Sequence, residues 1–106
     1  MWQVTVDTKV SAFIEQLELS SQSKALGILK LLEEYGSLLR KPHSKKISGY
    51  PNLFELRTSG SSPVRMFYTI QNQKFRILHG FIKKSDKTRL RELRQAINRM
   101  RELTIK

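Results

Sequence analysis

Three basic residues fall in a stretch of the sequence that predicts β-strands, and their chemistry suits phosphate binding. Residues 53–84 alternate apolar with other residues and are interrupted twice by turn formers, which predicts three consecutive strands. Arg57, Arg65 and Lys83 lie there, although charge is disfavoured on a strand unless it is solvated or used. An arginine side chain binds two phosphate oxygens at once and keeps its charge. We therefore expect an anion site on this sheet.

More positive charge follows the last predicted strand. Lys83, Lys84 and Lys87 crowd the end of that strand and the beginning of a predicted helix. Cations are unfavourable beside a helix N-terminus, so the cluster indicates that an anion joins it. A lysine in such a cluster is also a candidate for proton transfer.

His79 is a further candidate for proton transfer. Side chains alternate along a strand, which places His79 on the same face as Lys83. Histidine is the side chain that exchanges protons near neutral pH, although a histidine between Leu78 and Phe81 more often has a structural role. Glu55 is an alternative base, or else a salt-bridge partner of Arg57 or Arg65. These assignments stay open at the level of sequence.

The distribution of charge favours a polyanionic partner. The 106 residues carry a net charge of +11. Residues 1–36 have three Lys or Arg and five acids, hence −2, whereas residues 37–106 have the other 17 basic residues and four acids, hence +13. A one-sided positive field attracts nucleic acid, although a solubilising surface or an acidic protein partner would also explain it. The residues predicted to contact RNA are Lys41, Lys45, Lys46, Lys87, Arg89 and Arg91.

The composition argues against several other classes of site. The chain has no cysteine, and its two histidines, His43 and His79, are far apart and not accompanied by clustered carboxylates. We therefore expect no metal and no cofactor. No apolar run approaches the roughly 18 residues that span a bilayer, and the N-terminal MWQVTVDTK has no basic leader. We expect no membrane contact and a cytoplasmic location.

The remaining pattern predicts the elements that position these residues. A short edge strand over residues 2–6 precedes a helix capped by Asp7 or Thr8, and a second helix restarts at residues 20–21 and ends at Gly36. This hairpin is predicted to be a packing platform without chemistry of its own. A basic loop over residues 37–52, with a short strand near residues 46–48, leads to hairpin turns at 59–63 and 71–73. The last helix is predicted from Thr88 or Arg89, with a buried stripe of Leu90, Leu93, Ile97, Met100 and either Leu103 or Thr104.

Together these elements predict one domain, residues 1–106, of the α+β class. Its N-terminal strand and helical hairpin pack on an antiparallel sheet of three to four strands, and a basic helix ends the chain.

The succession LFELR, VRMFY and ILHGFIKKSDKT, followed by a basic helix, resembles the RelE/HigB-type toxin superfamily, in its phage-derived HigB-like branch. The resemblance covers nearly the whole chain. It implies a RelE-like microbial RNase fold and metal-free cleavage of mRNA in the ribosomal A site. It also implies neutralisation by an antitoxin encoded nearby, usually one with a helix-turn-helix domain.

The resemblance implies roles for particular residues. Arg65 matches the arginine that contacts the scissile phosphate, Lys83 or Lys84 matches the basic residue after the last strand, and Arg57 is a motif position. This sequence departs from RelE at the positions implied in proton transfer. Leu53 and Glu55 stand where RelE has two functional lysines, and the last helix has no tyrosine where RelE uses one. The second hypothesis is therefore a non-catalytic module that binds RNA or the ribosome, or a degenerate toxin that retains only antitoxin binding.

Overall fold

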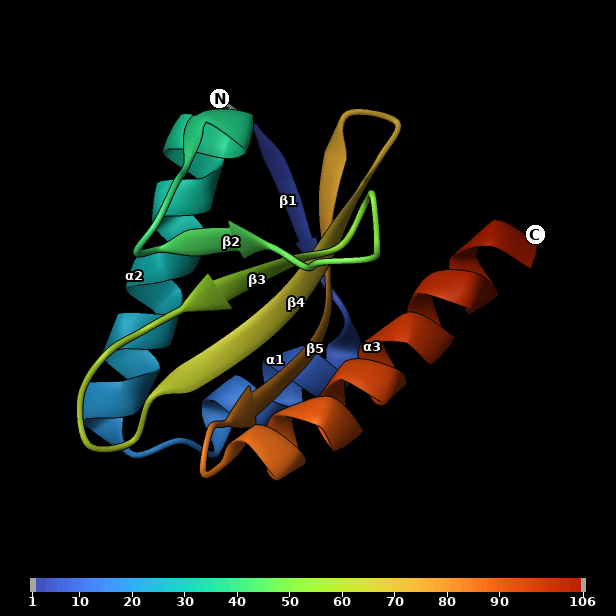
Figure 1. Ribbon diagram of the computed structural model, residues 1–106. Helices are drawn as coiled ribbons and strands as arrows, with labels where there is room; N and C mark the ends of the chain where they lie inside the picture. The colour runs from blue at the N-terminus through green and yellow to red at the C-terminus, as the bar shows by residue number, and fades with distance from the viewer. Residues whose placement is uncertain (1, 106) are drawn as a thin grey trace.

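A five-stranded sheet separates two helical layers in the computed structural model, which describes residues 2–105 and the side chains of residues 2–103 (Figure 1). Along the sheet the strand order is β1-β5-β4-β3-β2, with β1 parallel to β5 and every other pair antiparallel. The strands are β1 (Gln3–Val6), β2 (Ser44–Lys46), β3 (Phe54–Arg57), β4 (Val64–Gln71) and β5 (Lys74–Ile82). The helices are α1 (Thr8–Glu15), α2 (Leu19–Tyr35), the 3-10 turn η1 (Gly36–Leu38) and α3 (Asp86–Ile105).

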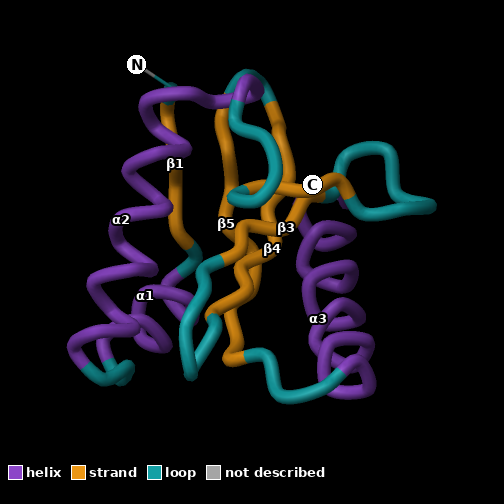
Figure 2. The backbone as a smooth tube through the Cα atoms, turned by 60° about the vertical axis from the view of Figure 1, so that its left-hand side comes forward, coloured by secondary structure: helices purple, strands orange, loops and turns teal. Residues whose placement is uncertain are grey.

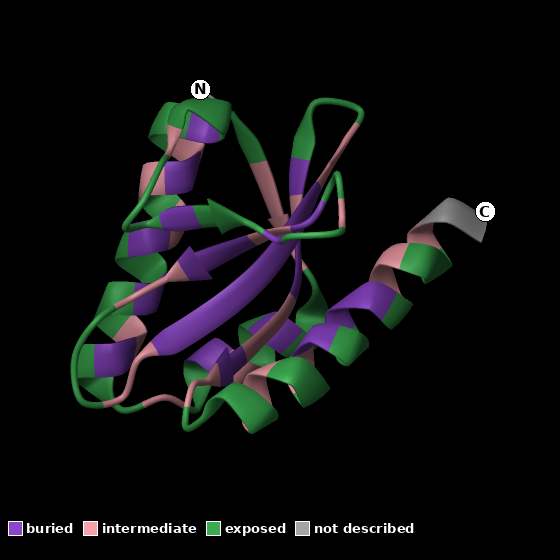
Figure 3. Ribbon diagram, in the orientation of Figure 1, coloured by how far each residue is buried: buried purple, intermediate pink, exposed green. Residues whose placement is uncertain are grey.

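Helices α1 and α2 cover one face of the sheet and α3 covers the other (Figure 2). Strand β4 is central and buried along most of its length, as the burial colouring shows (Figure 3). Its side chains divide between the two layers as the period of two requires: Val64, Met66 and Tyr68 join the core under α1 and α2, whereas Phe67 joins the core under α3. Each layer therefore has its own apolar core.

The α1/α2 core gathers aliphatic side chains of the helical hairpin over alternate residues of β3, β4 and β5. Its buried members are Val10, Ile14, Ala25, Ile28, Leu32, Leu56, Val64, Met66, Tyr68, Phe75 and Ile77. The α3 core is smaller and contains Ile47, Leu53, Phe67, Leu78, Phe81, Leu93, Ala96 and Ile97. Leu78 and Phe81 differ in parity along β5 yet share the α3 core, because a β-bulge lets His79, rather than Leu78, pair with Phe67.

Several predicted boundaries are confirmed. Asp7 caps α1, with its carboxylate accepting a hydrogen bond from the backbone N–H of Lys9 at 2.8 Å. Gly36 ends α2 with a φ of 53°, a conformation that glycine adopts at little cost. The tight turn between β4 and β5 places Asn72 and Gln73 at φ values of 52° and 65°.

The α+β class is confirmed, but the predicted antiparallel sheet of three to four strands has five strands and is mixed. The N-terminal strand adds a parallel edge beside β5, and β2 lies at residues 44–46 rather than 46–48. Strands of three or four residues carry too few side chains to fix their partners or register from the sequence.

The prediction for the last helix needs two corrections. It begins at Asp86, two or three residues before the predicted start, because Ser85 accepts the Thr88 N–H at 3.1 Å. Leu90 was predicted to be buried, yet 55% of its surface is exposed. Leu93 and Ile97 are buried as predicted, whereas the side chain of Thr104 lies outside the described residues. Among the described residues, none of the helices combines the length and apolar character needed to span a bilayer.

Candidate functional site

Arg57 and Arg65 lie directly opposite each other on β3 and β4. Both point to the α3 side of the sheet, because Phe67, two residues after Arg65, packs in the α3 core. Like charges in directly opposed positions destabilise a sheet. The pair is therefore a candidate anion site at the end of the β3–β4 ladder, since a bound anion would remove the repulsion.

Arg65 is held in place by the backbone around it. Only 8% of its surface is exposed. Its Nη1 donates hydrogen bonds to the carbonyl oxygens of Thr58, at 2.9 Å, and Val64, at 3.2 Å. Burial lowers the pKa of Arg65, and the nearby charge of Arg57 lowers it further. Guanidinium pKa values are so high that the side chain keeps its charge, and so Arg65 is a rigid cation.

The acid nearest in the ladder is occupied by another arginine. Glu55 is 2% exposed, and Arg89 of α3 donates to it from Nε at 3.0 Å and from Nη2 at 3.3 Å. Two-point pairing of this kind is the strongest geometry between arginine and a carboxylate. Glu55 is therefore paired with Arg89, and among the described residues no salt bridge joins an acid to Arg57 or Arg65, although the nearby charge of Glu55 partly opposes the lowering of the Arg65 pKa.

Like Glu55, His79 has a side-chain partner on α3. Its Nε2 lies 2.7 Å from Oε2 of Glu92, and the side chain of His79 is 14% exposed. A carboxylate only accepts hydrogen bonds, so Nε2 carries the proton of this contact and Nδ1 is the ring nitrogen left for exchange. In the ladder Glu55, Phe67 and His79 form one row across the sheet, and α3 covers this row with Arg89 and Glu92.

The lysines surround the connection between β5 and α3. Lys83 follows β5, its backbone N–H donates to Pro63 at 2.9 Å, and its Nζ lies 3.6 Å from Asp86. Lys84 and Lys87 are exposed. Lys83 is thus adjacent to the loop that follows Arg57, and its side chain adds to the positive charge at that end of the sheet.

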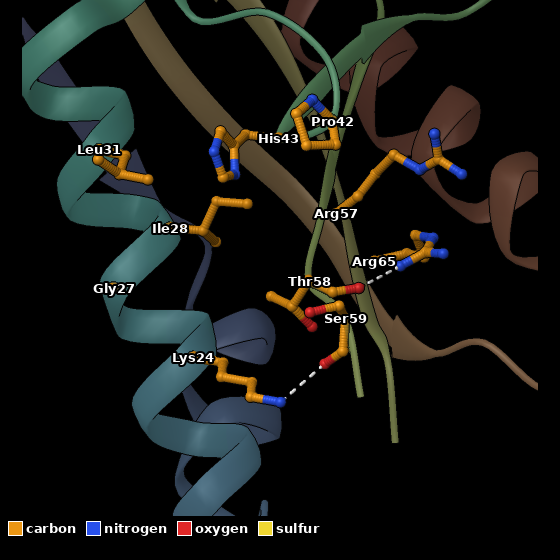
Figure 4. A pocket seen from close by; sticks show the side chains of 10 residues that line it. All are labelled: Lys24, Gly27, Ile28, Leu31, Pro42, His43, Arg57, Thr58, Ser59 and Arg65. Carbon is orange, nitrogen blue, oxygen red and sulfur yellow. Dashed lines mark hydrogen bonds between the residues drawn. The ribbon is translucent and has the colours of Figure 1, made fainter. Parts of the chain in front are cut away.

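A cavity of about 550 Å³ opens beside the two arginines (Figure 4). Helix α2 forms one wall, and the segments before β2 and after β3 form the other. The lining residues are Lys24, Gly27, Ile28, Leu31, Pro42, His43, Arg57, Thr58, Ser59 and Arg65, none of which is acidic. The side chains of Arg57 and Arg65 turn away from α2 in this view, so the cavity and the two guanidinium groups lie on opposite sides of the β3 edge.

Two comparisons with known proteins match this sequence and this fold. The family model described as phage-derived protein Gp49-like matches residues 12–101. The chain belongs to the phage-derived Gp49-like family. The structure is similar to that of a double arginine-to-alanine mutant of the E. coli toxin RelE in the free state, with a TM-score of 0.67 and 15% sequence identity over 92% of this chain and 96% of that chain. A search of curated proteins found no match. The resemblance to RelE/HigB-type toxins, and with it the RelE-like fold, is confirmed.

This Gp49-like chain brings some of the predicted site residues together and keeps others apart. Arg57 and Arg65 are paired across the ladder, Lys83 lies near them at the end of β5, and His79 lies one row further along the sheet. Glu55 has neither of its two predicted partners, because Arg89 takes it. The described residues include no group of three or more His, Cys, Asp or Glu that could hold a metal ion.

The residues predicted to contact RNA form two groups in the Gp49-like fold. Lys41, Lys45 and Lys46 are exposed on and before the edge strand β2, whereas Lys87 and Arg91 are exposed in the first turns of α3. Arg89 differs from them because its guanidinium is bound to Glu55. As RNA contacts all six remain predictions.

The cavity could not be predicted from the sequence, because its walls come from residues 24–31 and 42–65, which are distant along the chain. Helix α2 was predicted to be a packing platform without chemistry of its own; its residues Lys24 and Gly27 also line the cavity, and His43 lies across from them. The one local signal is Gly27, a glycine inside a run of good helix formers, where glycine is less favourable than alanine.

Proposed function

We propose that this protein is the toxin of a type II toxin–antitoxin system and that it cleaves mRNA on the ribosome without a metal ion. The observation that carries the proposal is the Arg57–Arg65 pair, two opposed cations whose nearest acid is already bound by Arg89. Family membership and the RelE-like fold support the toxin assignment. The one-sided positive charge supports RNA as the substrate.

The proposed reaction uses the nucleophile that RNA itself carries. A base removes the proton of a 2′-OH, the 2′ oxygen attacks the adjacent phosphorus, and the bond from phosphorus to the 5′ oxygen breaks. The departing 5′ oxygen takes a proton, so the products are a cyclic phosphate and a 5′-OH. Negative charge on the phosphate is greatest at the transition state, and fixed cations placed there lower the barrier.

In this reaction Arg65 is the main ligand of the phosphate. Two hydrogen bonds to the backbone hold Nη1, and Nε and Nη2 have no partner among the described residues, so they are available to phosphate oxygens. Arg57 is the second cation on the same phosphate, and Lys83 or Lys84 adds charge from the end of β5. His79 is the candidate for proton transfer through Nδ1, with Glu92 orienting its ring.

The test is single-turnover cleavage of ribosome-bound mRNA by the wild-type chain and by Arg65→Ala, with and without a metal chelator. We expect the wild type to cut in the presence of the chelator and Arg65→Ala to lose at least about 100-fold in rate. Cleavage that stops with the chelator would overturn the metal-free mechanism.

A toxin of this kind requires a neutralising partner in its own cell. We propose an antitoxin encoded nearby, with a helix-turn-helix domain, that covers the basic surface or withdraws catalytic residues. Expression of the chain alone should arrest growth, and co-expression with the adjacent reading frame should restore growth and allow the two proteins to be purified together. Harmless expression with no co-purifying partner would contradict this proposal.

A non-catalytic RNA- or ribosome-binding module is the second candidate. The observation that favours it is that the two groups best suited to proton transfer, Glu55 and His79, both have partners on α3. Such a module would bind ribosomes as tightly as an active toxin and leave the mRNA intact in the cleavage assay.

A further inference from the structure

Another cavity, the β2 groove, lies between the segment that follows η1 and the edge strand β2 (Figure 1). Its volume is about 420 Å³, within the range of roughly 300–1,000 Å³ that is typical of ligand sites. Its floor contains Leu39, Phe54, Tyr68 and Ile70, all of which belong to the α1/α2 core or pack against it. The groove therefore opens on the face of the sheet opposite to that of the arginine pair.

The floor of the β2 groove is apolar and has no polar group to spare. The hydroxyl groups of Tyr68 and Ser44 are 2.7 Å apart and satisfy each other. Among the described residues, no buried side-chain nitrogen or oxygen lacks a hydrogen-bond partner. The rings of Phe54 and Tyr68 are stacked on each other, with centroids 5.1 Å apart, and Tyr68 is 2% exposed.

Such a floor suits an apolar side chain better than an RNA base. A base is recognised by hydrogen bonds to its edges and by stacking on an open ring face. Tyr68 offers neither, because its ring is buried and its hydroxyl group is bonded. Leu39 and Ile70 are half-buried and aliphatic, so they offer surface for an apolar contact and no flat ring.

The rim of the β2 groove is positively charged. It carries Arg40, Lys41, Lys45 and Lys46, and no acid lines the groove. All four basic residues are exposed, and within the described part of the chain no salt bridge joins any of them to an acid. Carboxylates on a partner would complement this rim, and complementary charge favours association and fixes its orientation.

We propose that the β2 groove docks an acidic segment of a protein partner, with a bulky apolar side chain on the floor and flanking carboxylates against the rim. The choice of partner rests on the proposed function, in which the antitoxin is the protein expected to carry such a segment. A partner held there occupies Lys41, Lys45 and Lys46, which are predicted to contact RNA, and leaves the arginine pair uncovered on the other face.

The first test is binding to the isolated wild-type protein, measured by NMR with three probes. They are a synthetic peptide of leucine and glutamate, a peptide of the same charge with serine in place of leucine, and a single-stranded oligoribonucleotide. The leucine peptide should shift the signals of Leu39 and Ile70 and bind at least about 10-fold more tightly than the serine peptide, the effect of burying one apolar side chain.

Two outcomes of this titration would overturn the proposal. Equal affinity of the two peptides would mean that charge alone attracts them and that the floor contributes nothing. Shifts of the Leu39 and Ile70 signals by the oligoribonucleotide, and none by the leucine peptide, would make the groove an RNA site.

Two adjacent leucines provide a matched pair for the floor. Leu39 lines the groove, whereas Leu38 is 69% exposed and does not line it. Leu39→Gln should weaken binding of the leucine peptide by about 10-fold or more, and Leu38→Gln should change it by less than about 2-fold. Equal effects of the two variants would contradict the proposed seat of the apolar side chain.

Charge reversal provides a matched pair for the rim. Arg40→Glu with Lys46→Glu should weaken binding of the leucine peptide by at least about 5-fold, because carboxylates then face carboxylates. Lys9→Glu with Lys30→Glu makes the same change in net charge at exposed positions that do not line the groove, and should leave binding nearly unchanged. Thermal unfolding of each variant confirms that the chain is folded.

The outcome for the groove is distinguishable from the outcome for the proposed function, because the titration involves neither cleavage nor growth. Peptide binding with the expected variant pattern, together with mRNA that stays intact in the cleavage assay, would support the groove and remove the nuclease assignment. Cleavage by a wild-type chain that does not bind the leucine peptide would overturn the groove and leave the nuclease standing.

Discussion

Arg89 of α3 holds the carboxylate of Glu55, which is 2% exposed on β3, through both of its oxygens at 3.0 and 3.3 Å. Three residues later on the same helix face, Glu92 lies 2.7 Å from His79 of β5. Helix α3 thus pairs Arg89 with Glu55 and Glu92 with His79. Buried Phe67 lies between Glu55 and His79 in the sheet. These two contacts fix the rotation of α3 and turn Leu90 outward.

Arg89→Ala should destabilise the fold by about 2–4 kcal/mol, because it leaves Glu55 buried and unpaired. Chemical denaturation measures this. Arg91→Ala, an exposed position on the same helix, should change the free energy of unfolding by less than about 0.5 kcal/mol. The double variant Glu55→Leu with Arg89→Met should recover most of the loss, since an apolar replacement of the whole pair removes the buried charge. A double variant no more stable than Arg89→Ala would show that the cost has another origin.

Arg65→Ala should reduce single-turnover cleavage by about 100- to 1000-fold, the cost of one lost donor to transition-state charge. Arg65→Lys should recover only part of the rate, because an ammonium group keeps the charge and loses the planar fork. The side chain is buried and bonded to the Thr58 and Val64 carbonyls, so we also expect Arg65→Ala to lose about 1–2 kcal/mol of stability.

Arg91→Ala is the control for the cleavage measurement. It should change the affinity for ribosomes far more than the rate of cleavage. Circular dichroism confirms folding of both variants. A folded Arg65→Ala that cuts at nearly the wild-type rate would make Arg65 a structural residue.

Binding to single-stranded RNA should weaken steeply with salt, with a slope of roughly −0.7 for each phosphate neutralised. Replacing Lys45 and Lys46 together should reduce the magnitude of that slope by about 1.4 if each contacts one phosphate. Replacing Lys9 and Lys30, which are exposed in the acidic N-terminal third, is the matched control and should leave the slope unchanged. Equal effects of the two pairs would point to net charge alone.

Gly27→Ala should stabilise the protein by about 0.5–1 kcal/mol, because it removes a helix glycine and the added methyl group meets no other atom within 4 Å. Gly36→Ala is the contrast, since a Cβ there would collide with the Trp2 ring and the φ of 53° disfavours other residues. Thermal unfolding should therefore move in opposite directions for the two variants. A destabilised Gly27→Ala would mean that the cavity wall at this position is not open.

Tyr68 should make the fold sensitive to alkaline pH. Burial raises its pKa, and the hydrogen bond with Ser44 at 2.7 Å only partly opposes this. The unfolded chain loses the phenol proton near pH 10, before the folded chain does, so the contribution of Tyr68 is complete below about pH 10 and falls as pH rises toward its folded-state pKa. Unfolding measured at about pH 8 and about pH 11 should show a larger loss for the wild type than for Tyr68→Phe. Equal losses would exclude Tyr68 as the cause.

Periodicity predicted the parts of this fold that local side-chain chemistry decides. The two faces of β4, the caps at Asp7 and Gly36, and the buried positions Leu93 and Ile97 all follow from patterns within a few residues. Leu90 was mispredicted because it lies at the edge of the apolar stripe, where the contacts of Arg89 and Glu92 decide the helix rotation. Such polar pairing between distant elements leaves no periodic signal.

The same limit applies to the candidate site. Arg57 and Arg65 could be identified because a charged residue on a strand is conspicuous, but their direct opposition depends on the register of β3 against β4. The bulge at Leu78 decides which side of β5 carries His79, and the cavity depends on how closely α2 approaches the segment before β2. These are consequences of tertiary packing.

The edge strand β2 has one further consequence. It has three residues, and two of them are the exposed lysines Lys45 and Lys46. An unpaired strand edge is a template on which another chain can add a strand, and short edges bearing lysine discourage such aggregation. The lysines assigned to RNA therefore also protect the solubility of the protein. Variants that remove them are better made with glutamine than with β-branched apolar residues, which would turn the same edge into a nucleus for aggregates.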